Sequence, residues 1–175
     1  KETKRLDDLS TNILLTSQLD MGKYEADKQL VNLSELVRQT IKSFQERYPS
    51  RVCNTMVGDA MEIQGEPLLI QLLINNLMDN ANKYAPITEP IYIQLKAHQN
   101  TVQLIVKDQG PGIADADKNK VFEKFYRLGS ESTRTTKGSG LGLYLCKKIA
   151  TFHNAQIQLT NNIPTGSIFT VTFIN

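Results

Sequence analysis

The chain has little of what marks several common protein classes. Its 175 residues include two cysteines and no tryptophan, and Cys53 and Cys146 stand far apart. So few thiols, without metal-ligand spacing, argue against a disulfide scaffold and predict two ordinary packing residues. The 20 basic and 18 acidic residues give a formal charge of +2. This balance predicts no nucleic-acid partner and makes any affinity for phosphate a local property.

Long apolar runs are absent as well. The longest extend over a few residues, so no segment could span a bilayer, and the first residues lack the apolar stretch of a signal peptide. Hydrophobic residues nevertheless make up 40% of the chain, which is long enough to bury a core. We therefore expect one soluble globular domain with an appended helix.

Hydrophobic periodicity predicts a mixture of helices and strands. Helices are expected over residues 1–21, 33–48, 66–85 and 141–152, and strands within 51–63 (two), at 91–95, 102–106, near 157 and over 167–173. The first helix is amphipathic and begins without a cap, as though it continued a longer helix whose apolar seam has a partner. Asn32 and Ser34 compete to cap the second. A loop of roughly thirty residues is expected before the last helix, and loops of that length are often functional.

Polar residues gather on one face of the third helix. Asn76 and Asn80 are one turn apart, and Lys83 and Tyr84 follow about a turn later. An amide oxygen suits Mg2+, which takes few protein ligands and completes its shell with phosphates and water, so Asn80 is the candidate metal ligand. Lys83 would add positive charge for phosphates, and Tyr84 would pack beside a nucleotide. A solvated helix face would give the same pattern.

Asp108 comes just after an apolar strand, and two glycines, Gly110 and Gly112, follow it closely. A carboxylate at a strand end can accept a hydrogen bond from the exocyclic amine of adenine, which guanine lacks at the corresponding position. The glycines permit close backbone approach and positive φ angles that a side chain would forbid. The alternative is an Asx-type turn without a ligand.

Residues 138–143 (Gly-Ser-Gly-Leu-Gly-Leu) lead directly into the last helix. Free backbone amides and the positive end of the helix dipole predict a phosphate site there. A dinucleotide-binding fold does not fit, because its glycine turn follows a buried strand, whereas the polar run 130–137 precedes this one; the Walker pattern is also absent. A flexible hinge before the helix is the alternative.

Residues 121–127 form an aromatic and basic island in otherwise polar sequence, and we expect them to anchor a mobile lid at about 109–139. Phe122 and Phe125 would grip the domain from one side of a short helix, while Lys124 and Arg127 turn toward phosphate. Burial of each ring is worth about 1.5 to 3 kcal/mol, which favours a docked lid. A purely structural surface helix is the alternative.

With these four pieces in this order, the chain resembles the catalytic, ATP-binding domain of bacterial two-component sensor histidine kinases. The same superfamily includes gyrase-type topoisomerases, mismatch-repair ATPases and Hsp90-type chaperones. Residues 76–84 resemble the family's N box, 108–112 its first glycine box, 121–127 its F box and 138–143 its second glycine box. The resemblance implies an α/β two-layer sandwich of the Bergerat type, a mixed β-sheet packed under three helices, with ATP between the asparagine-bearing helix and the lid.

The resemblance also implies roles for single residues. Asn80 would hold Mg2+, Asp108 would bind adenine, and Ser167 stands where relatives often carry a hydroxyl near adenine. The full set of expected ATP-binding residues is Asn76, Asn80, Lys83, Tyr84, Asp108, Gly110, Gly112, Ile113, Lys124, Phe125, Tyr126, Arg127, Gly138, Ser139, Gly140, Leu141, Gly142, Leu143 and Ser167.

Asn76 separates the branches of the superfamily. In the hydrolysing relatives the residue four before the metal-binding Asn is a Glu that activates water, and an amide cannot be a general base. We therefore expect slow hydrolysis and transfer of the γ-phosphate to an imidazole, which depends on alignment and charge. Asp79 is a weaker substitute base, since it lies about 100° from Asn80 around the helix. The rivals are a self-contained ATPase, an interaction module without nucleotide affinity, and a serine kinase.

The family resemblance also implies partners. Residues 1–30 would be the end of a dimerisation and phosphotransfer helix with its linker, and residues 31–175 the catalytic domain. The phosphoacceptor histidine would lie on a helical hairpin outside this chain, because His98 and His153 stand in a hairpin turn and near a helix end, where both are expected to be structural. A response-regulator receiver domain is the expected second partner. The full protein is expected to be a homodimeric, membrane-anchored sensor with this domain in the cytoplasm.

Overall fold

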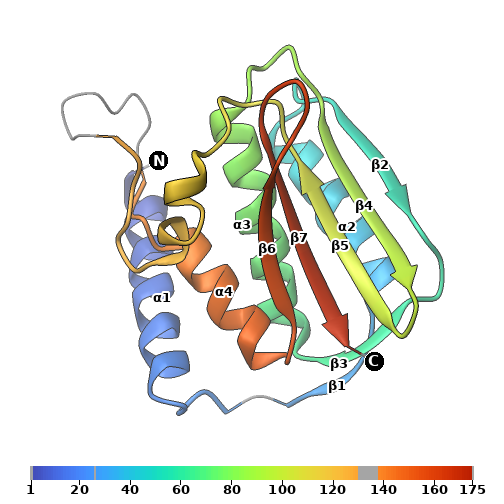
Figure 1. The fold of residues 1–175 in the computed structure, drawn as a ribbon. Helices are drawn as coiled ribbons and strands as arrows, with labels where there is room; N and C mark the ends of the chain where they lie inside the picture. The colour runs from blue at the N-terminus through green and yellow to red at the C-terminus, as the bar shows by residue number, and fades with distance from the viewer. Residues whose placement is uncertain (1, 26, 130–137, 175) are drawn as a thin grey trace.

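The fold has two layers, in a computed structural model that describes residues 2–25, 27–129 and 138–174. One layer is a five-stranded sheet of β2 (Cys53–Val57), β4 (Ile91–His98), β5 (Thr101–Lys107), β7 (Ser167–Ile174) and β6 (Gln156–Asn161), in that spatial order. β2 and β4 are parallel, and every other neighbouring pair is antiparallel. The helices α2 (Leu33–Arg47), α3 (Pro67–Tyr84) and α4 (Gly142–Phe152) cover one face (Figure 1). This arrangement confirms the predicted α/β sandwich with a mixed sheet.

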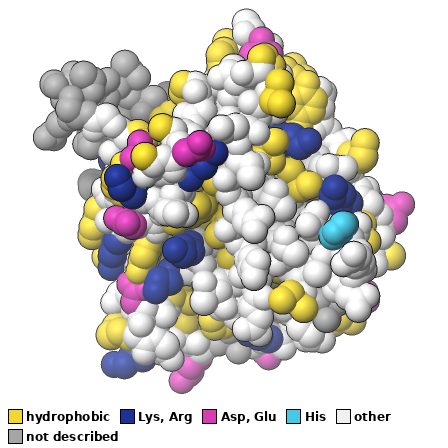
Figure 2. All heavy atoms as spheres, in the orientation of Figure 1, with side chains coloured by type: hydrophobic (Ala, Val, Ile, Leu, Met, Phe, Trp, Pro, Cys, Tyr) yellow, Lys and Arg dark blue, Asp and Glu magenta, His cyan; other side chains and the backbone are white. Residues whose placement is uncertain are grey.

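The core lies between the sheet and the three helices because strand side chains alternate between the two faces. In β4, Ile91, Ile93 and Leu95 are buried, whereas Tyr92 between the first two and Lys96 after Leu95 are exposed. Leu73 and Leu77 of α3 belong to the same buried cluster. None of the described helices lies over the opposite face of the sheet, and Figure 2 shows that face as a surface made largely of uncharged polar side chains and backbone.

α1 (Glu2–Asp20) lies beside α4 at one side of the sandwich (Figure 1). Its residues Leu15 and Leu19 pack against the main core. In the described parts of the chain, no helix combines the length and the apolar character that a membrane span requires.

The small second sheet was not predicted. β1 (Gln29–Asn32) pairs antiparallel with β3 (Glu62–Gly65) just before α2. Val31 is the one β1 side chain that is buried, so the strand has no hydrophobic alternation by which sequence could announce it.

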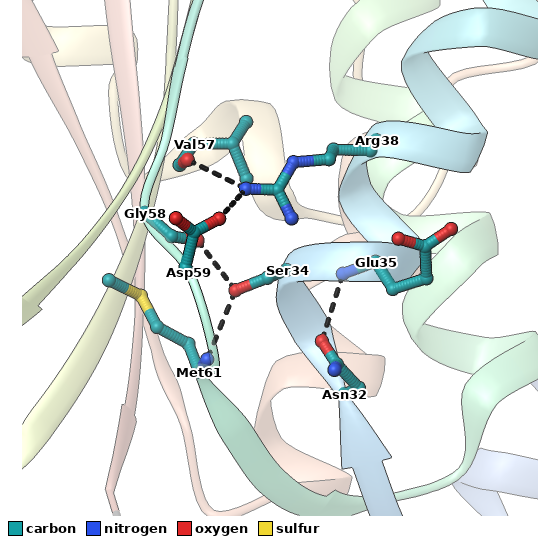
Figure 3. Close-up of polar contacts among 8 residues, drawn as sticks. All are labelled: Asn32, Ser34, Glu35, Arg38, Val57, Gly58, Asp59 and Met61. Atoms are coloured by element: carbon teal, nitrogen blue, oxygen red, sulfur yellow. Dashed lines mark hydrogen bonds and ion pairs between the residues drawn. The ribbon is translucent and has the colours of Figure 1, made fainter.

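Asn32, rather than Ser34, caps α2: the Asn32 side chain accepts a hydrogen bond from the Glu35 amide at 3.0 Å. Ser34 is buried instead, where its hydroxyl donates to the Gly58 carbonyl at 2.6 Å and accepts from the Met61 amide at 3.0 Å (Figure 3). The serine thereby ties the start of α2 to the connection between β2 and β3 and satisfies one carbonyl and one amide of that partly buried connection.

The long connection between β5 and α4 contains two short 3-10 helices, η1 (Asp115–Asp117) and η2 (Lys120–Phe122). It therefore matches the long loop that the sequence predicts, with a small amount of local structure. The predicted lid, about 109–139, includes residues 130–137, which lie outside the described residues.

Candidate functional site

A cavity of about 390 Å3 opens between α3, the start of α4 and the connection that follows β5. This volume is in the range of small-molecule sites. The lining residues that the sequence predicted are Asn76, Asn80, Lys83, Tyr84, Asp108, Gly112, Ile113, Tyr126, Arg127, Gly138, Ser139, Gly140, Gly142, Leu143 and Ser167. The structure thus brings residues from three distant motifs, and from the lid region between them, to one site.

Asp108 lies at the bottom of this cavity with 4% of its surface exposed. Its Oδ1 accepts hydrogen bonds from the Gly110 amide at 2.8 Å and the Ser167 amide at 3.3 Å. Burial raises the pKa of the carboxyl group, and the two amide hydrogen bonds oppose that shift. Both bonds end on Oδ1, so Oδ2 is the oxygen that a ligand in the cavity can engage.

The backbone around Asp108 is fixed from the neighbouring strand. The Asp108 amide donates to the Ser167 carbonyl at 2.9 Å, and the Asn162 side chain donates to the Asp108 carbonyl at 2.8 Å. Gly166 faces the same carbonyl with a φ of +112°, a conformation that side chains rarely adopt. The carboxylate therefore stands on a rigid support built from two adjacent strands.

α3 has four asparagines, and their hydrogen bonds separate them. Asn76 donates to the Leu72 carbonyl at 3.0 Å, Asn75 accepts from Arg47 at 2.9 Å, and Asn82 accepts from Arg51 at 2.7 Å. Asn80 lines the cavity, and its amide makes no hydrogen bond within the described residues. Its side chain is therefore the α3 amide that can turn both of its polar atoms to a ligand, and its oxygen is of the kind that Mg2+ takes.

Lys83 supplies positive charge at the mouth of the cavity. Its ammonium donates to the Tyr84 hydroxyl at 3.1 Å and lies 4.7 Å from the centre of the Tyr84 ring. A β-carbon on Gly138 would come within 2.7 Å of the Lys83 Nζ, so this ammonium faces the start of the glycine-rich segment. Positive charge from α3 and the backbone of that segment therefore meet at one place.

The start of α4 faces the cavity through Gly142 and Leu143. No side chain of the described residues caps this helix, and its first turn contains no acidic residue. The Ser139 hydroxyl accepts a hydrogen bond from the Leu141 amide at 3.3 Å just ahead of it. An uncapped helix start directs backbone N–H groups and the positive end of the helix dipole into the cavity. This part of the cavity is therefore suited to binding an anion.

The structure agrees with the prediction for one of the two lid phenylalanines and differs for the other. Phe122 is buried, with its ring 6.3 Å from that of Phe169 in an edge-on arrangement, as expected of an anchor. Phe125 is 59% exposed, which contradicts the predicted second grip. The reason is its backbone: Phe125 has a φ of +66° and donates to the Gly140 carbonyl at 3.1 Å, so the chain reverses there and the ring points outward.

Lys124 also departs from its predicted place. Its ammonium lies 3.4 Å from Asp20 at the end of α1, and it does not line the cavity, whereas Arg127 does. Two further predicted residues support the site from behind: Gly110 donates its amide to Asp108, and Leu141 is fully buried. Their side chains or backbones hold lining residues in position.

Five lining residues are absent from the expected ATP-binding set. Asp79 was considered only as a substitute base, and Pro111 and Val121 lie within the motifs 108–112 and 121–127 without having been named as ligand-binding. Asn12 comes from α1 and Leu128 from the segment after the F-box-like residues. Nothing in a single sequence could place Asn12, because its position depends on α1 lying alongside α4. Leu128 directly follows the predicted motif 121–127, so the sequence came closer to identifying it.

Asp79 and His153 have structural partners, and His98 lies at a strand end. Asp79 lines the cavity, and its Oδ2 also pairs with Arg47 of α2 at 3.6 Å. His153 is buried, with Nε2 accepting from the Glu66 amide at 3.0 Å and Nδ1 2.7 Å from the Ile149 carbonyl. His98 ends β4 at the predicted hairpin turn. Asn154 adopts the left-handed conformation expected after α4, with a φ of +54°.

Comparison with known proteins gives consistent matches. The family described as Histidine kinase-, DNA gyrase B-, and HSP90-like ATPase matches residues 65–174. The sensor histidine kinase CusS of Escherichia coli K12 is 29% identical over 98% of this chain, and the signal transduction histidine-protein kinase BaeS of the same organism is 32% identical over 95%. The catalytic domain of histidine kinase ThkA superposes with a TM-score of 0.73 at 26% identity, over 85% of this chain and 95% of that one. The chain spans about a third of the length of its curated relatives, 36% of CusS and 35% of BaeS.

Proposed function

Because this chain belongs to the family of histidine kinase-, DNA gyrase B- and HSP90-like ATPases, and within it is an ATP-binding domain of the sensor histidine kinase type, we propose that its cavity binds Mg-ATP for phosphate transfer to a histidine outside this chain. The buried carboxylate of Asp108 carries the proposal. It faces a cavity whose other wall is the uncapped start of α4. The exocyclic amine of adenine needs a hydrogen-bond acceptor, which the carboxylate supplies, and phosphates need hydrogen-bond donors, which the helix start supplies.

The adenine end of the nucleotide is assigned to Asp108 and Ser167. With Oδ1 held by two backbone amides, Oδ2 of Asp108 accepts a hydrogen bond from the exocyclic amine of adenine. Guanine presents a carbonyl oxygen there and would place two acceptors against each other, so the carboxylate selects adenine. Gly112 and Ile113 would line the base, and the Ser167 hydroxyl would lie close to it.

The phosphate end is assigned to the start of α4 and to Lys83 and Arg127, all of which line the cavity. Backbone amides near Gly140 and Gly142 offer hydrogen bonds to phosphate oxygens, and the two side chains add positive charge. Mg2+ would be held by the Asn80 oxygen and by phosphates, and would neutralise charge on the transferring group. The residues present fit this ion, since the Asn80 amide has no competing hydrogen bond among the described residues.

Asn76 favours transfer over hydrolysis. Its amide is engaged with the Leu72 carbonyl and cannot take a proton from water. Asp79, the carboxylate next to Asn80, also lines the cavity, but it pairs with Arg47 and stands about 100° from Asn80 around the helix. The position that holds the water-activating Glu in hydrolysing relatives therefore offers no base. An imidazole nucleophile that approaches the γ-phosphate needs none, because its neutral nitrogen already has a free lone pair.

The assignment extends to parts outside this chain. Residues 1–30 would join the catalytic domain, 31–175, to a helical hairpin that bears the phosphoacceptor histidine and forms the homodimer. The phosphoryl group would then pass to a response-regulator receiver domain. We place this domain on the cytoplasmic side of a membrane-anchored sensor, where Mg-ATP is available.

Incubation with Mg-ATP separates this proposal from its rivals. The chain should bind nucleotide saturably, hydrolyse it slowly and show no stoichiometric phosphohistidine on His98 or His153 by mass spectrometry. Rapid steady hydrolysis would instead support an ATPase of the chaperone or topoisomerase branch, and absence of saturable binding would support an interaction module. Phosphate transfer to a separately added hairpin with the acceptor histidine is the positive test, and transfer to serine would contradict the proposal.

A further inference from the structure

Arg51, just before β2, has a buried guanidinium that is fully engaged by a neighbouring helix end. It is 4% exposed. Its Nε donates to the Asn82 side chain at 2.7 Å, Nη1 to the carbonyls of Pro86 at 2.6 Å and Glu89 at 2.9 Å, and Nη2 to the carbonyls of Asn82 at 2.9 Å and Ala85 at 3.0 Å. These bonds use all five N–H groups of the side chain. Every acceptor is neutral, so Arg51 is a buried cation whose partners are backbone and amide oxygens.

The location explains how a charge is tolerated there. α3 ends at Tyr84, and the carbonyls of its last turn have no partners within the helix. They also form the negative end of the helix dipole. The planar guanidinium satisfies the Asn82 and Ala85 carbonyls together and fixes the turn through Pro86 and Glu89. Lysine could not reproduce this, because its ammonium has three donors and no fork.

The turn that Arg51 holds is the one that presents the phosphate and metal end of the proposed site. Its partners Asn82 and Ala85 stand on either side of Lys83 and Tyr84 in the sequence, and both of those residues line the cavity. Asn80 lies less than one helical turn before Asn82. Asn82 and Asn80 lie about 200° apart around the helix, so Arg51 grips the side of α3 that faces away from the cavity. Asp108, in contrast, is supported by β7 and has no contact with this guanidinium among the described residues.

We propose that Arg51 is a positioning residue for Mg-ATP: from behind α3 it fixes where Asn80 and Lys83 stand, without touching the nucleotide. This inference rests on the proposed function and adds to it the residue that sets the geometry of its metal and phosphate end. An arginine that merely stabilised the fold would affect both ends of the nucleotide equally. A positioning arginine affects the triphosphate and Mg2+ end more than the adenine end.

The test compares two ligands in folded protein. Affinities for adenosine and for a non-hydrolysable ATP analogue with Mg2+ are measured by calorimetry on wild type, Arg51→Lys and, as a matched control, Arg38→Lys. Arg38 of α2 also donates to a backbone carbonyl, that of Val57 (Figure 3), but it forms no hydrogen bond or ion pair with α3 among the described residues. Arg51→Lys should weaken the Mg-analogue by about tenfold or more and adenosine by much less. Arg38→Lys should change neither ligand.

A second variant covers the case in which Arg51→Lys is unstable. Asn82→Ala removes only the Nε partner and should weaken the Mg-analogue by about threefold, again with adenosine spared. Amide NMR shifts of Asn80 and Lys83 in ligand-free protein should move in both variants and not in Arg38→Lys. Equal weakening of both ligands, or wild-type affinity in folded Arg51→Lys and Asn82→Ala, would overturn the positioning role alone. Absence of binding by the wild type would overturn the proposed function with it.

Discussion

Gly166 packs so closely against Asp108 that a β-carbon on residue 166 would overlap the Asp108 carbonyl oxygen. The contact joins the start of β7 to the turn that orients the carboxylate. The position directly behind the proposed adenine site therefore requires a glycine, which adopts a φ of +112° there.

Gly166→Ala should therefore impair stability and the site together. The strained φ alone costs of order 1 to 3 kcal/mol, and relief of the overlap requires the Asp108 turn to move. We expect a lower midpoint in urea denaturation and weaker binding of the ATP analogue. Gly22→Ala is the matched control, because Gly22 also has a positive φ, +63°, with no atom within 4 Å of an added β-carbon. Equal losses in the two variants would contradict the close contact.

The stability of the domain should decrease in mild acid because of His153. Burial lowers the pKa of this imidazole below its ordinary value of 6.5. Between the lowered pKa and 6.5 the unfolded chain binds a proton that the folded chain does not, so the free energy of unfolding falls as pH falls, by at most about 1.4 kcal/mol per pH unit. Urea denaturation from pH 7.5 to 5 measures this slope. His153→Gln should flatten the profile; a flat wild-type profile would show that His153 is accessible to protons.

Asp20 should hold α1 against the catalytic domain. Its carboxylate lies 2.7 Å from Lys148, accepts from the Tyr144 hydroxyl at 2.7 Å and lies 3.4 Å from Lys124. These partners lower the pKa of Asp20, chiefly through the Lys148 hydrogen bond, so the carboxylate is charged at neutral pH. Asp20→Asn should cost about 0.5 to 1 kcal/mol of α1 docking, seen as faster amide exchange in α1. Lys148→Ala should have a larger effect than Lys124→Ala, and unchanged exchange in Asp20→Asn would refute the role.

The elements that could be predicted from the sequence are those with a regular hydrophobic pattern and with turn or capping residues at their ends. α3 and the β4–β5 hairpin could be predicted because their buried residues recur regularly and their ends carry turn residues. β1 could not, since one buried valine leaves no period, and the strand exists because β3 pairs with it. Local pattern predicts an element only when the element buries a whole face.

The site residues also differ in whether a local sequence pattern could identify them. Residues that belong to contiguous motifs, such as Asp108 and Gly140, could be identified because their spacing along the chain carries the chemistry. Phe125 and Lys124 were placed wrongly because a single positive φ reverses the backbone and because Asp20 attracts the lysine from a distant helix. Asn12 and Arg51 depend on packing between segments far apart in sequence, which no local pattern records.

The central claim is that one carboxylate and one amide, Asp108 and Asn80, select and hold Mg-ATP. Calorimetric titration of a non-hydrolysable ATP analogue, with and without Mg2+, tests it on wild type, Asp108→Asn and Asn80→Ala. Wild type should bind saturably and prefer the adenine over the guanine analogue. Asp108→Asn should lose that preference, since its amide no longer offers two acceptors, and Asn80→Ala should lose about tenfold or more of the Mg2+-dependent affinity. Wild-type affinity, base preference and Mg2+ dependence in both variants would contradict the account.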